Sequence, residues 1–416
     1  HIMGGAVLGI TVSDSSIGAT DQQISPPSVS LGSNSIDMTQ MSDGTWQAYV
    51  VDHESAINIQ GRFNENSNDD GFEYGILCDG GLGGQYGQAL SQDRGSTVKA
   101  YDVTTNPSFY QGFTALNKNH YCYDTADAGD SGAGGQYQMS VLESPAALNT
   151  NSGTGTNNSG NRNILVNSTN GFMSAWPFIQ AMNFSSSMGA AYAGEEVTVD
   201  WSTSRDYSIS ADRDIVPDGA TVNLTITDPG LNYDPTAADV WIMDAQNETL
   251  YFWNNGSEGD DQGAAHQVSK DSGTNISSGI VSKDGTQNGV LGTTALGYVC
   301  GNDCTMSVGG APKKVLGAAT TNPHQWNNMT FTETGDNTGV FETTVVTATE
   351  GLTADVAVDA SMTLTYGNTI TLIIGYEDAS ISLEAGDSWL PVETADFTLT
   401  DPDANKDSSK TETLSI

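Results

Sequence analysis

The sequence repeats itself over a long distance, and this limits the folds open to it. Residues 221–229 read TVNLTITDP, and 173 residues further along residues 394–402 read TADFTLTDP. Upstream, GEEVTV at 194–199 matches GNTITL at 367–372 with the same offset, and the triplet SIS lies between the two matches in both copies, one residue out of step. Biased composition does not place three matches in one order and nearly in register. We therefore expect duplicated domains.

Each repeated segment alternates apolar and polar residues with a period of two, which is typical of strands with one buried face. No apolar stripe with helical spacing runs for three turns. Short strands separated by Gly, Asp, Asn and Pro favour an all-β fold of tandem β-sandwich domains. The apolar sets expected to point inward are Val222, Leu224 and Ile226; Val197, Val199 and Trp201; Ile370, Leu372 and Ile374; and Met362, Leu364 and Tyr366.

A second pattern reads as strand, tight turn and strand. It is clear in residues 328–342, and residues 37–50 carry a weaker echo, so the N-terminal part is interpreted as a divergent relative of the same unit. Small polar residues crowd 148–163 and predict a linker or long loop. The expected domains are 4–170, 171–351 and 352–416, the last of them partial, and residues 1–3 are interpreted as a cloning remnant.

The charge of the chain is strongly one-sided. Asp and Glu number 51 against 13 Lys and Arg, which gives a formal net charge of -38. Self-repulsion of this size favours a setting where cations screen or bind the protein. Without a basic stripe, nucleic acid is excluded as a partner and an anionic membrane surface is disfavoured. No stretch of roughly 18 apolar residues is present, so we expect no membrane insertion.

Four cysteines show no Cys-x-x-Cys spacing, which disfavours a zinc cluster. Cys300 and Cys304 are expected to close a short disulfide loop, and Cys78 and Cys122 to pair with each other. Disulfides would fit an extracellular location. Buried free thiols are the alternative.

Both copies of the repeated strand end in an acidic loop. In the second copy, oxygen-bearing side chains at loop positions 1, 3, 5, 7 and 12 follow the ligand rhythm of a calcium loop, although the usual Gly at position 6 and the flanking helices are missing. The first copy has Gly230 where the second has an aspartate, and is expected to bind more weakly. Turn formation by Asp-Pro, with no metal, is the alternative. The candidate Ca²⁺ ligands are Asp228, Asn232, Asp234 and Asp239 in the first loop, and Asp401, Asp403, Asn405, Asp407 and Glu412 in the second.

Other acidic clusters at 124–130, 68–70 and 258–261 are interpreted as solvated turns more readily than as cation sites. The acceptor sequence for N-glycosylation is about as frequent as chance predicts in a chain this rich in Asn, Ser and Thr. The glycosylation candidates are Asn157, Asn167, Asn183, Asn223, Asn247, Asn255, Asn275 and Asn328.

Enzymatic patterns are missing from the sequence. The histidines beyond residue 1 are far apart and form no zinc motif, and neither a nucleophile elbow nor a phosphate-binding loop is found. A pair of carboxylates for glycoside hydrolysis stays open, because sequence gives no separation between side chains. We expect no catalysis.

Residues 224–234 together with 336–341 resemble the repeated immunoglobulin-like domains of surface-layer proteins from ammonia-oxidising archaea. The resemblance covers about half of the chain, from near residue 190 to the last residue. It implies a secreted, N-glycosylated subunit of a lattice, with immunoglobulin-like domains and with divalent cations that support assembly.

Three functions are weighed. The first is a structural subunit of an extracellular, cell-surface coat that self-associates into a lattice through Ca²⁺ and attracts small cations, ammonium included. The second is an adhesin or glycan-binding module that uses Trp241, Tyr251, Phe252 and Trp253 as a stacking platform, although a core position is preferred for Trp241, Tyr251 and Trp253. The third is a secreted hydrolase.

Overall fold

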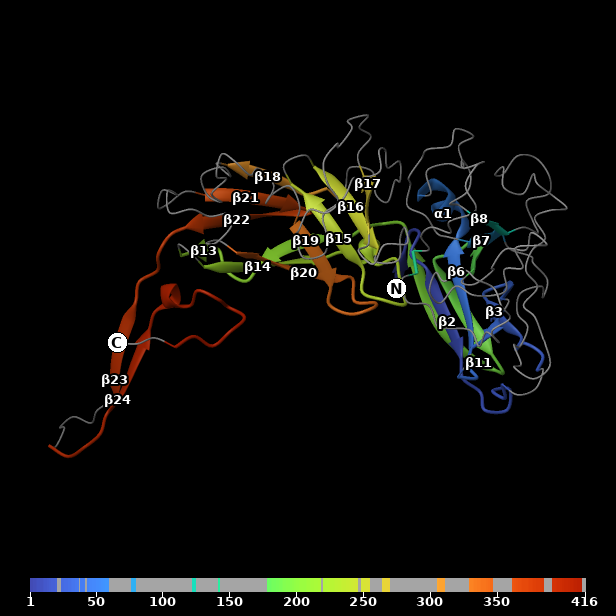
Figure 1. Ribbon diagram of the computed structural model, residues 1–416, viewed down its shortest axis with the longest axis horizontal. Coiled ribbons are helices and arrows are strands. Elements are labelled where there is room, and N and C mark those ends of the chain that lie inside the picture. Colours follow the sequence, from blue (N-terminus) through green and yellow to red (C-terminus); the bar gives the residue numbers. More distant parts are fainter. Residues whose placement is uncertain are drawn as a thin grey trace, which may run out of the picture.

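The computed structural model describes residues 1–20, 24–36, 38–41, 43–59, 76–79, 122–124, 141–142, 178–217, 220–245, 248–254, 264–269, 305–310, 329–346, 361–384 and 391–413. Strands dominate these residues, and the α-helix among them is the short α1 (His53–Ile59). The predicted all-β class is therefore confirmed. The strands form three successive units that lie in a row, with the C-terminal hairpin projecting at one end (Figure 1).

Unit one consists of two layers with a shared core. Trp46, Val50 and Leu31 are completely buried in it, beside Met188 and Val12. One layer has the strand order β1 (Ile2–Met3), β11 (Glu195–Ser202), β10 (Ser187–Tyr192), β3 (Val29–Leu31) and β4 (Asn34–Ile36). The other has β2 (Leu8–Val12), β6 (Trp46–Asp52), β9 (Phe178–Met182), β7 (Ile76–Asp79) and β8 (Cys122–Asp124), and β5 (Thr39–Gln40) pairs with β6.

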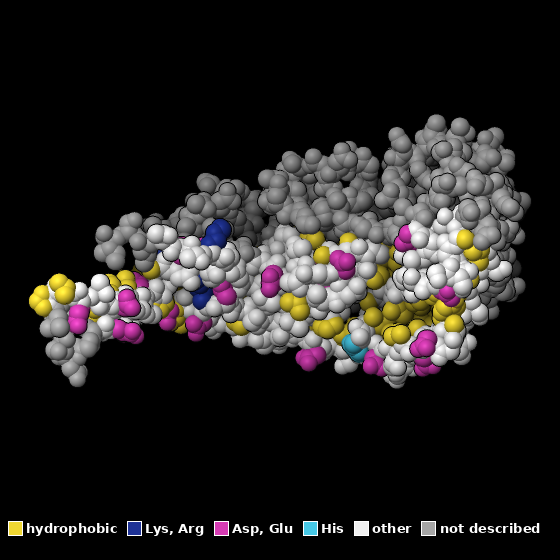
Figure 2. Space-filling view, turned by 90° about the horizontal axis from the view of Figure 1, so that it is seen from below, with side chains coloured by type: hydrophobic (Ala, Val, Ile, Leu, Met, Phe, Trp, Pro, Cys, Tyr) yellow, Lys and Arg dark blue, Asp and Glu magenta, His cyan; other side chains and the backbone are white. Residues whose placement is uncertain are grey.

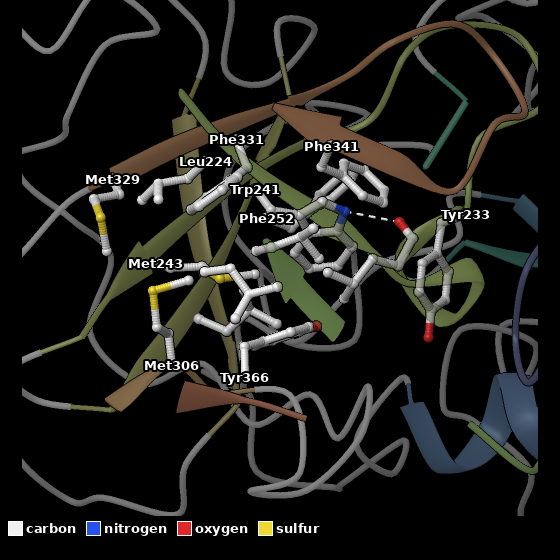
Figure 3. Packing of buried hydrophobic residues seen from close by; sticks show 14 of the residues in the cluster. Leu224, Tyr233, Trp241, Met243, Phe252, Met306, Met329, Phe331, Phe341 and Tyr366 are labelled. Carbon is white, nitrogen blue, oxygen red and sulfur yellow. Dashed lines mark hydrogen bonds between the residues drawn. The ribbon is translucent and has the colours of Figure 1, made fainter. Parts of the chain in front are cut away.

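Unit two repeats the two-layer plan. Its larger layer has the order β12 (Ser208–Ala211), β14 (Thr221–Thr227), β20 (Val340–Val346), β19 (Met329–Glu333), β15 (Val240–Asp244), β16 (Thr249–Asn254) and β17 (Ala264–Ser269). Its smaller layer has β13 (Ile215–Val216), β22 (Asn368–Ile374), β21 (Ser361–Tyr366) and β18 (Ser307–Gly310). Side chains from both layers meet in one cluster, where Trp241, Phe331, Phe341 and Tyr366 are almost completely buried (Figure 3).

Unit three is a hairpin of β23 (Ser380–Glu384) and β24 (Asp396–Thr400), followed by a 3-10 turn at Pro402–Ala404. Its register is that of the first hairpin pair of unit two: Ser380 lies opposite Thr400, as Ser208 lies opposite Thr227. The predicted duplication is thus reproduced in the strand pairing.

The sheets divide the chain at other places than the predicted boundaries. Strands β9, β10 and β11 follow the boundary at 170/171, yet they pair with β6, β3 and β1 of the first unit. The duplicated stretch spans the end of one unit and the start of the next, so the units meet near 203–207 and 375–379. Ile2 and Met3, expected to lie outside the first domain, form β1, and Met3 is buried.

The predicted alternation holds for most of the strands. Every second residue of β14 is buried, and so is every second residue of β21. Among the exceptions are β23 and β24, which are exposed throughout, and β11, where Val197 is 69% exposed although its pattern predicts an inward position. The first half of β11 is exposed on both faces, so alternation alone gives its side chains no core to enter.

Candidate functional site

Three aspartates at strand ends form the same turn. Asp14, Asp228 and Asp401 follow β2, β14 and β24, and in each the Oδ1 atom accepts the backbone N–H two residues further on, at 2.8, 2.8 and 3.1 Å. The backbone carbonyl of each also accepts the N–H three residues on, at 3.1, 3.1 and 3.2 Å. Two of these turns were expected from the repeat. The third, at Asp14, lacks the proline and was not identified from the sequence.

The two turns that contain proline match in detail. Asp228 (φ -155°, ψ 94°) and Asp401 (φ -141°, ψ 98°) both precede a single 3-10 turn, and Asn232 and Asn405 end it with similar dihedrals. Pro229 and Pro402 occupy the first turn, where a missing N–H costs no hydrogen bond. The expected Asp-Pro turn chemistry is therefore present in both copies.

A tyrosine from the opposite layer reaches the aspartate in units one and two. The hydroxyl of Tyr192, at the end of β10, donates to Oδ2 of Asp14 at 2.7 Å. The hydroxyl of Tyr366, at the end of β21, donates to Oδ2 of Asp228. Both tyrosines precede a tight turn with a left-handed glycine, and at Gly367 a Cβ atom would lie 2.0 Å from a backbone carbonyl oxygen. Each hydrogen bond links the two layers of its unit.

Asp228 also has a cationic partner within the protein. Its side chain is completely buried and forms an ion pair with Arg205, which is 14% exposed. Burial raises the pKa of Asp228, and Arg205, Tyr366 and the Gly230 N–H oppose this rise. A Cβ atom at position 230 would lie 2.7 Å from Nε of Arg205, so the glycine makes room for the guanidinium.

The corresponding place in unit three is acidic. Asp403 replaces Gly230, and its two carboxylate oxygens accept the N–H of Glu377 at 3.0 and 3.1 Å. Glu377 lies three residues before β23, as Arg205 lies three residues before β12. Unit two thus balances its turn aspartate with an arginine, whereas unit three carries a further aspartate and a glutamate.

The downstream carboxylates of both loops accept hydrogen bonds from their own loop. Asp234 accepts from the N–H and hydroxyl of the residue two positions on, and Asp407 does the same. Asp239 accepts the N–H groups of residues 233 and 234, and Glu412 accepts that of residue 406. Across the described ranges, no group of three or more His, Cys, Asp or Glu side chains is arranged to hold a metal ion. The calcium sites stay a prediction, and turn chemistry without metal accounts for these contacts.

Two of the candidate ligands of the first loop, Asp234 and Asp239, are buried near Glu333, which was not identified from the sequence. Asp234, Asp239 and Glu333 are 2%, 2% and 4% exposed, and one oxygen of Asp239 has no hydrogen-bond partner among the residues that the structure describes. Burial, then the charge of Asp234 and then that of Glu333 raise the pKa of Asp239 well above its usual value. Glu333 accepts the N–H groups of Thr338 and Gly339, each at 2.7 Å, and so holds the turn that contacts Asp228.

One backbone hydrogen bond between adjacent units occurs twice. The N–H of Val7 donates to the carbonyl of Tyr233 at 3.0 Å, and the N–H of Thr221 donates to the carbonyl of Lys406 at 2.7 Å. Both donors lie seven residues before the turn aspartate of their unit, and both acceptors lie five residues after that of the next unit.

A second pair of neighbouring positions recurs at the same two places. A Cβ atom on Gly9 would lie 3.5 Å from the Pro235 side chain, and the equivalent positions are Asn223 and Ser408, joined by a hydrogen bond of 2.7 Å. The two junctions therefore share their geometry. They differ in polarity, because Gly9 and Pro235 carry no polar side-chain group, whereas Asn223 and Ser408 form a hydrogen bond.

Asn223 is also a glycosylation candidate. Its side-chain nitrogen donates to Asp212 and Ser408, and a glycan attached there would remove one of the two N–H donors and so break at least one of these hydrogen bonds. Asn183 is exposed and open to modification. The remaining candidates (Asn157, Asn167, Asn247, Asn255, Asn275 and Asn328) lie outside the described residues, as do residues 68–70, 125–130 and 258–261.

Cys78 and Cys122 lie directly opposite each other in the register of β7 and β8. Their disulfide stays a prediction, and Cys300 and Cys304 lie outside the described residues. The preferred core position is confirmed for Trp241, which is completely buried, and stays a prediction for Tyr251 and Trp253. Phe252, named only for the stacking platform, is 4% exposed. Trp241 donates to the carbonyl of Leu231 at 2.7 Å, the dashed line in Figure 3.

Comparison with known proteins gives no family. No protein-family model matches the chain, and no curated protein is similar to it at a significant level. None of the described helices has the length and apolar character needed to span a membrane.

Proposed function

We propose that this chain is a structural subunit of an extracellular surface layer, built from immunoglobulin-like β-sandwich units and without catalytic activity. The observation that supports it best is the repeated junction, in which Val7 and Thr221 bond the loop of the next unit at equivalent positions. A fixed relation between neighbours is what a load-bearing chain of domains needs, because free linkers would let the units move independently.

The charge supports the same proposal. Acidic side chains are spread along the face of the molecule drawn in Figure 2, whereas basic side chains occupy few places on it. With a net charge of -38, neighbouring copies in a lattice would repel one another unless cations lay between them. We propose that Ca²⁺ acts between copies, because carboxylate oxygens are the ligands that it prefers and acidic side chains are spread over this surface.

Assembly in calcium and in chelator tests this proposal. The purified chain, concentrated in millimolar Ca²⁺, should form ordered arrays in negative-stain electron microscopy, and excess chelator should disperse them. A variant with Asp403→Asn and Asp407→Asn should assemble poorly, whereas Glu195→Gln with Glu196→Gln, at exposed positions in β11, should behave as the parent. Arrays that persist in chelator would remove the calcium part. A monomer under every condition would refute the surface-layer function.

A further inference from the structure

The hairpin of unit three exposes a face that unit two buries. Ile381 lies opposite Leu399 and Leu383 lies opposite Phe397, with exposures of 64%, 43%, 52% and 55%. The residues at the same places in unit two are Ile209, Ile226, Ala211 and Leu224, and Ile209, Ile226 and Leu224 are at most 2% exposed. Figure 2 shows hydrophobic side chains at this end of the molecule.

The turn aspartate of the same hairpin is Asp401, and one of its carboxylate oxygens has no tyrosine hydroxyl as a donor among the described residues. In Asp14 and Asp228, Oδ1 accepts the turn N–H and Oδ2 accepts a tyrosine hydroxyl from the opposite layer. In Asp401, Oδ1 accepts the turn N–H in the same way, and the described residues provide no hydroxyl to Oδ2. The exposed apolar face of β23–β24 and the Oδ2 of Asp401, which has no hydroxyl donor among the described residues, independently indicate a binding place for one further structural element.

We propose that β23–β24 is the acceptor for a third tyrosine hairpin of the β21–β22 kind. The partner is a pair of antiparallel strands whose apolar residues alternate as Met362, Leu364 and Tyr366 do, with the tyrosine immediately before a left-handed glycine. Its apolar face covers Ile381 and Leu399, and its tyrosine hydroxyl donates to Asp401.

A second copy of this chain is not the partner, because its tyrosine hairpins are already in use. Tyr366 is 1% exposed, Met362 and Leu364 are completely buried, and Tyr192 bonds its own Asp14. A copy could offer either hairpin only by opening its own unit. The inference does not depend on the surface-layer function.

The test appends the sequence of residues 361–374 to the full chain through a flexible linker of about 20 Gly and Ser residues, which spans roughly 25 Å. Tethering gives the hairpin an effective concentration of about millimolar, which offsets the low stability of an isolated hairpin. Hydrogen exchange of 380–384 and 396–400, measured by mass spectrometry, should slow at least tenfold relative to the parent.

Three variants make the result specific. Phe397→Ser with Leu399→Ser in the acceptor should abolish the protection, and replacing the appended tyrosine by Phe should reduce it. Glu377→Arg should increase it, because it restores the cation that unit two places beside its turn aspartate. Unchanged exchange in the fused chain would overturn the proposal. So would protection that survives the acceptor variants, or slow exchange in the parent that depends on protein concentration.

Discussion

Replacing Arg205 by Met tests whether the buried ion pair with Asp228 supports unit two. The carboxylate of Asp228 is completely buried and would keep the hydrogen bonds from Tyr366 and Gly230, but it would lose its cation. Methionine preserves most of the aliphatic packing of the arginine stem, so the change acts mainly on charge.

The expected loss is about 3–5 kcal/mol, the usual cost of leaving one partner of a buried pair without the other. This is a large part of the roughly 5–15 kcal/mol that stabilises a typical domain. Adding Asp228→Asn should restore most of the loss, because the uncompensated charge disappears. The single variant should also regain stability as the pH falls: burial raises the folded-state pKa of Asp228, so the native state binds the proton more readily than the unfolded state.

Native-state hydrogen exchange of the β14 amides is the suitable assay, because units of one chain do not unfold as a single two-state system. The β2 amides of unit one provide the internal control and should change little. A loss below about 1 kcal/mol, or a double variant no more stable than Arg205→Met, would refute the role given to the ion pair.

Three further outcomes are expected. The parent should lose stability as the pH rises from acid toward neutral, because a carboxyl with a raised folded-state pKa favours the native state only while it is protonated. Asp239→Asn should remove this loss, and native-state hydrogen exchange at several pH values measures it. Tyr366→Phe should lower the melting temperature more than Tyr192→Phe, because only the first hydroxyl is bonded to a completely buried carboxylate. Alkylation of the unfolded chain should label Cys78 and Cys122 only after reduction, and reduction should cost roughly 4 kcal/mol of stability for a loop of this length.

The strands could be predicted because their signal is local. The alternation in residues 221–227 and 361–366 states which face is buried, and the structure follows it residue by residue. Turn chemistry is equally local, so the Asp-Pro turns at Asp228 and Asp401 were predictable from two residues each. Val197 shows the limit of this reasoning, because a strand pattern does not tell whether a second layer lies above it.

The partners of the turn aspartates were not predictable in the same way. Tyr366 lies 138 residues after Asp228, and Arg205 lies 23 residues before it, so neither contact has a periodic signal. One weak signal existed: a tyrosine precedes the turn glycine in both copies of the upstream repeat. The turn at Asp14 escaped notice because its offset from Asp228 differs from the 173 residues of the other pair, and because it has no proline.

The hydrogen bonds from Val7 and Thr221 to the loop of the next unit also affect how the molecule unfolds. Melting the loop around Tyr233 removes an acceptor from the unit before it, and melting that around Lys406 does the same one step later. Stability in such an array follows nearest-neighbour statistics, in which an interior member gains from two flanks and a terminal member from one. Fraying should therefore begin at the ends and travel inward, and lengthening the array should raise the cooperativity of every member already in it.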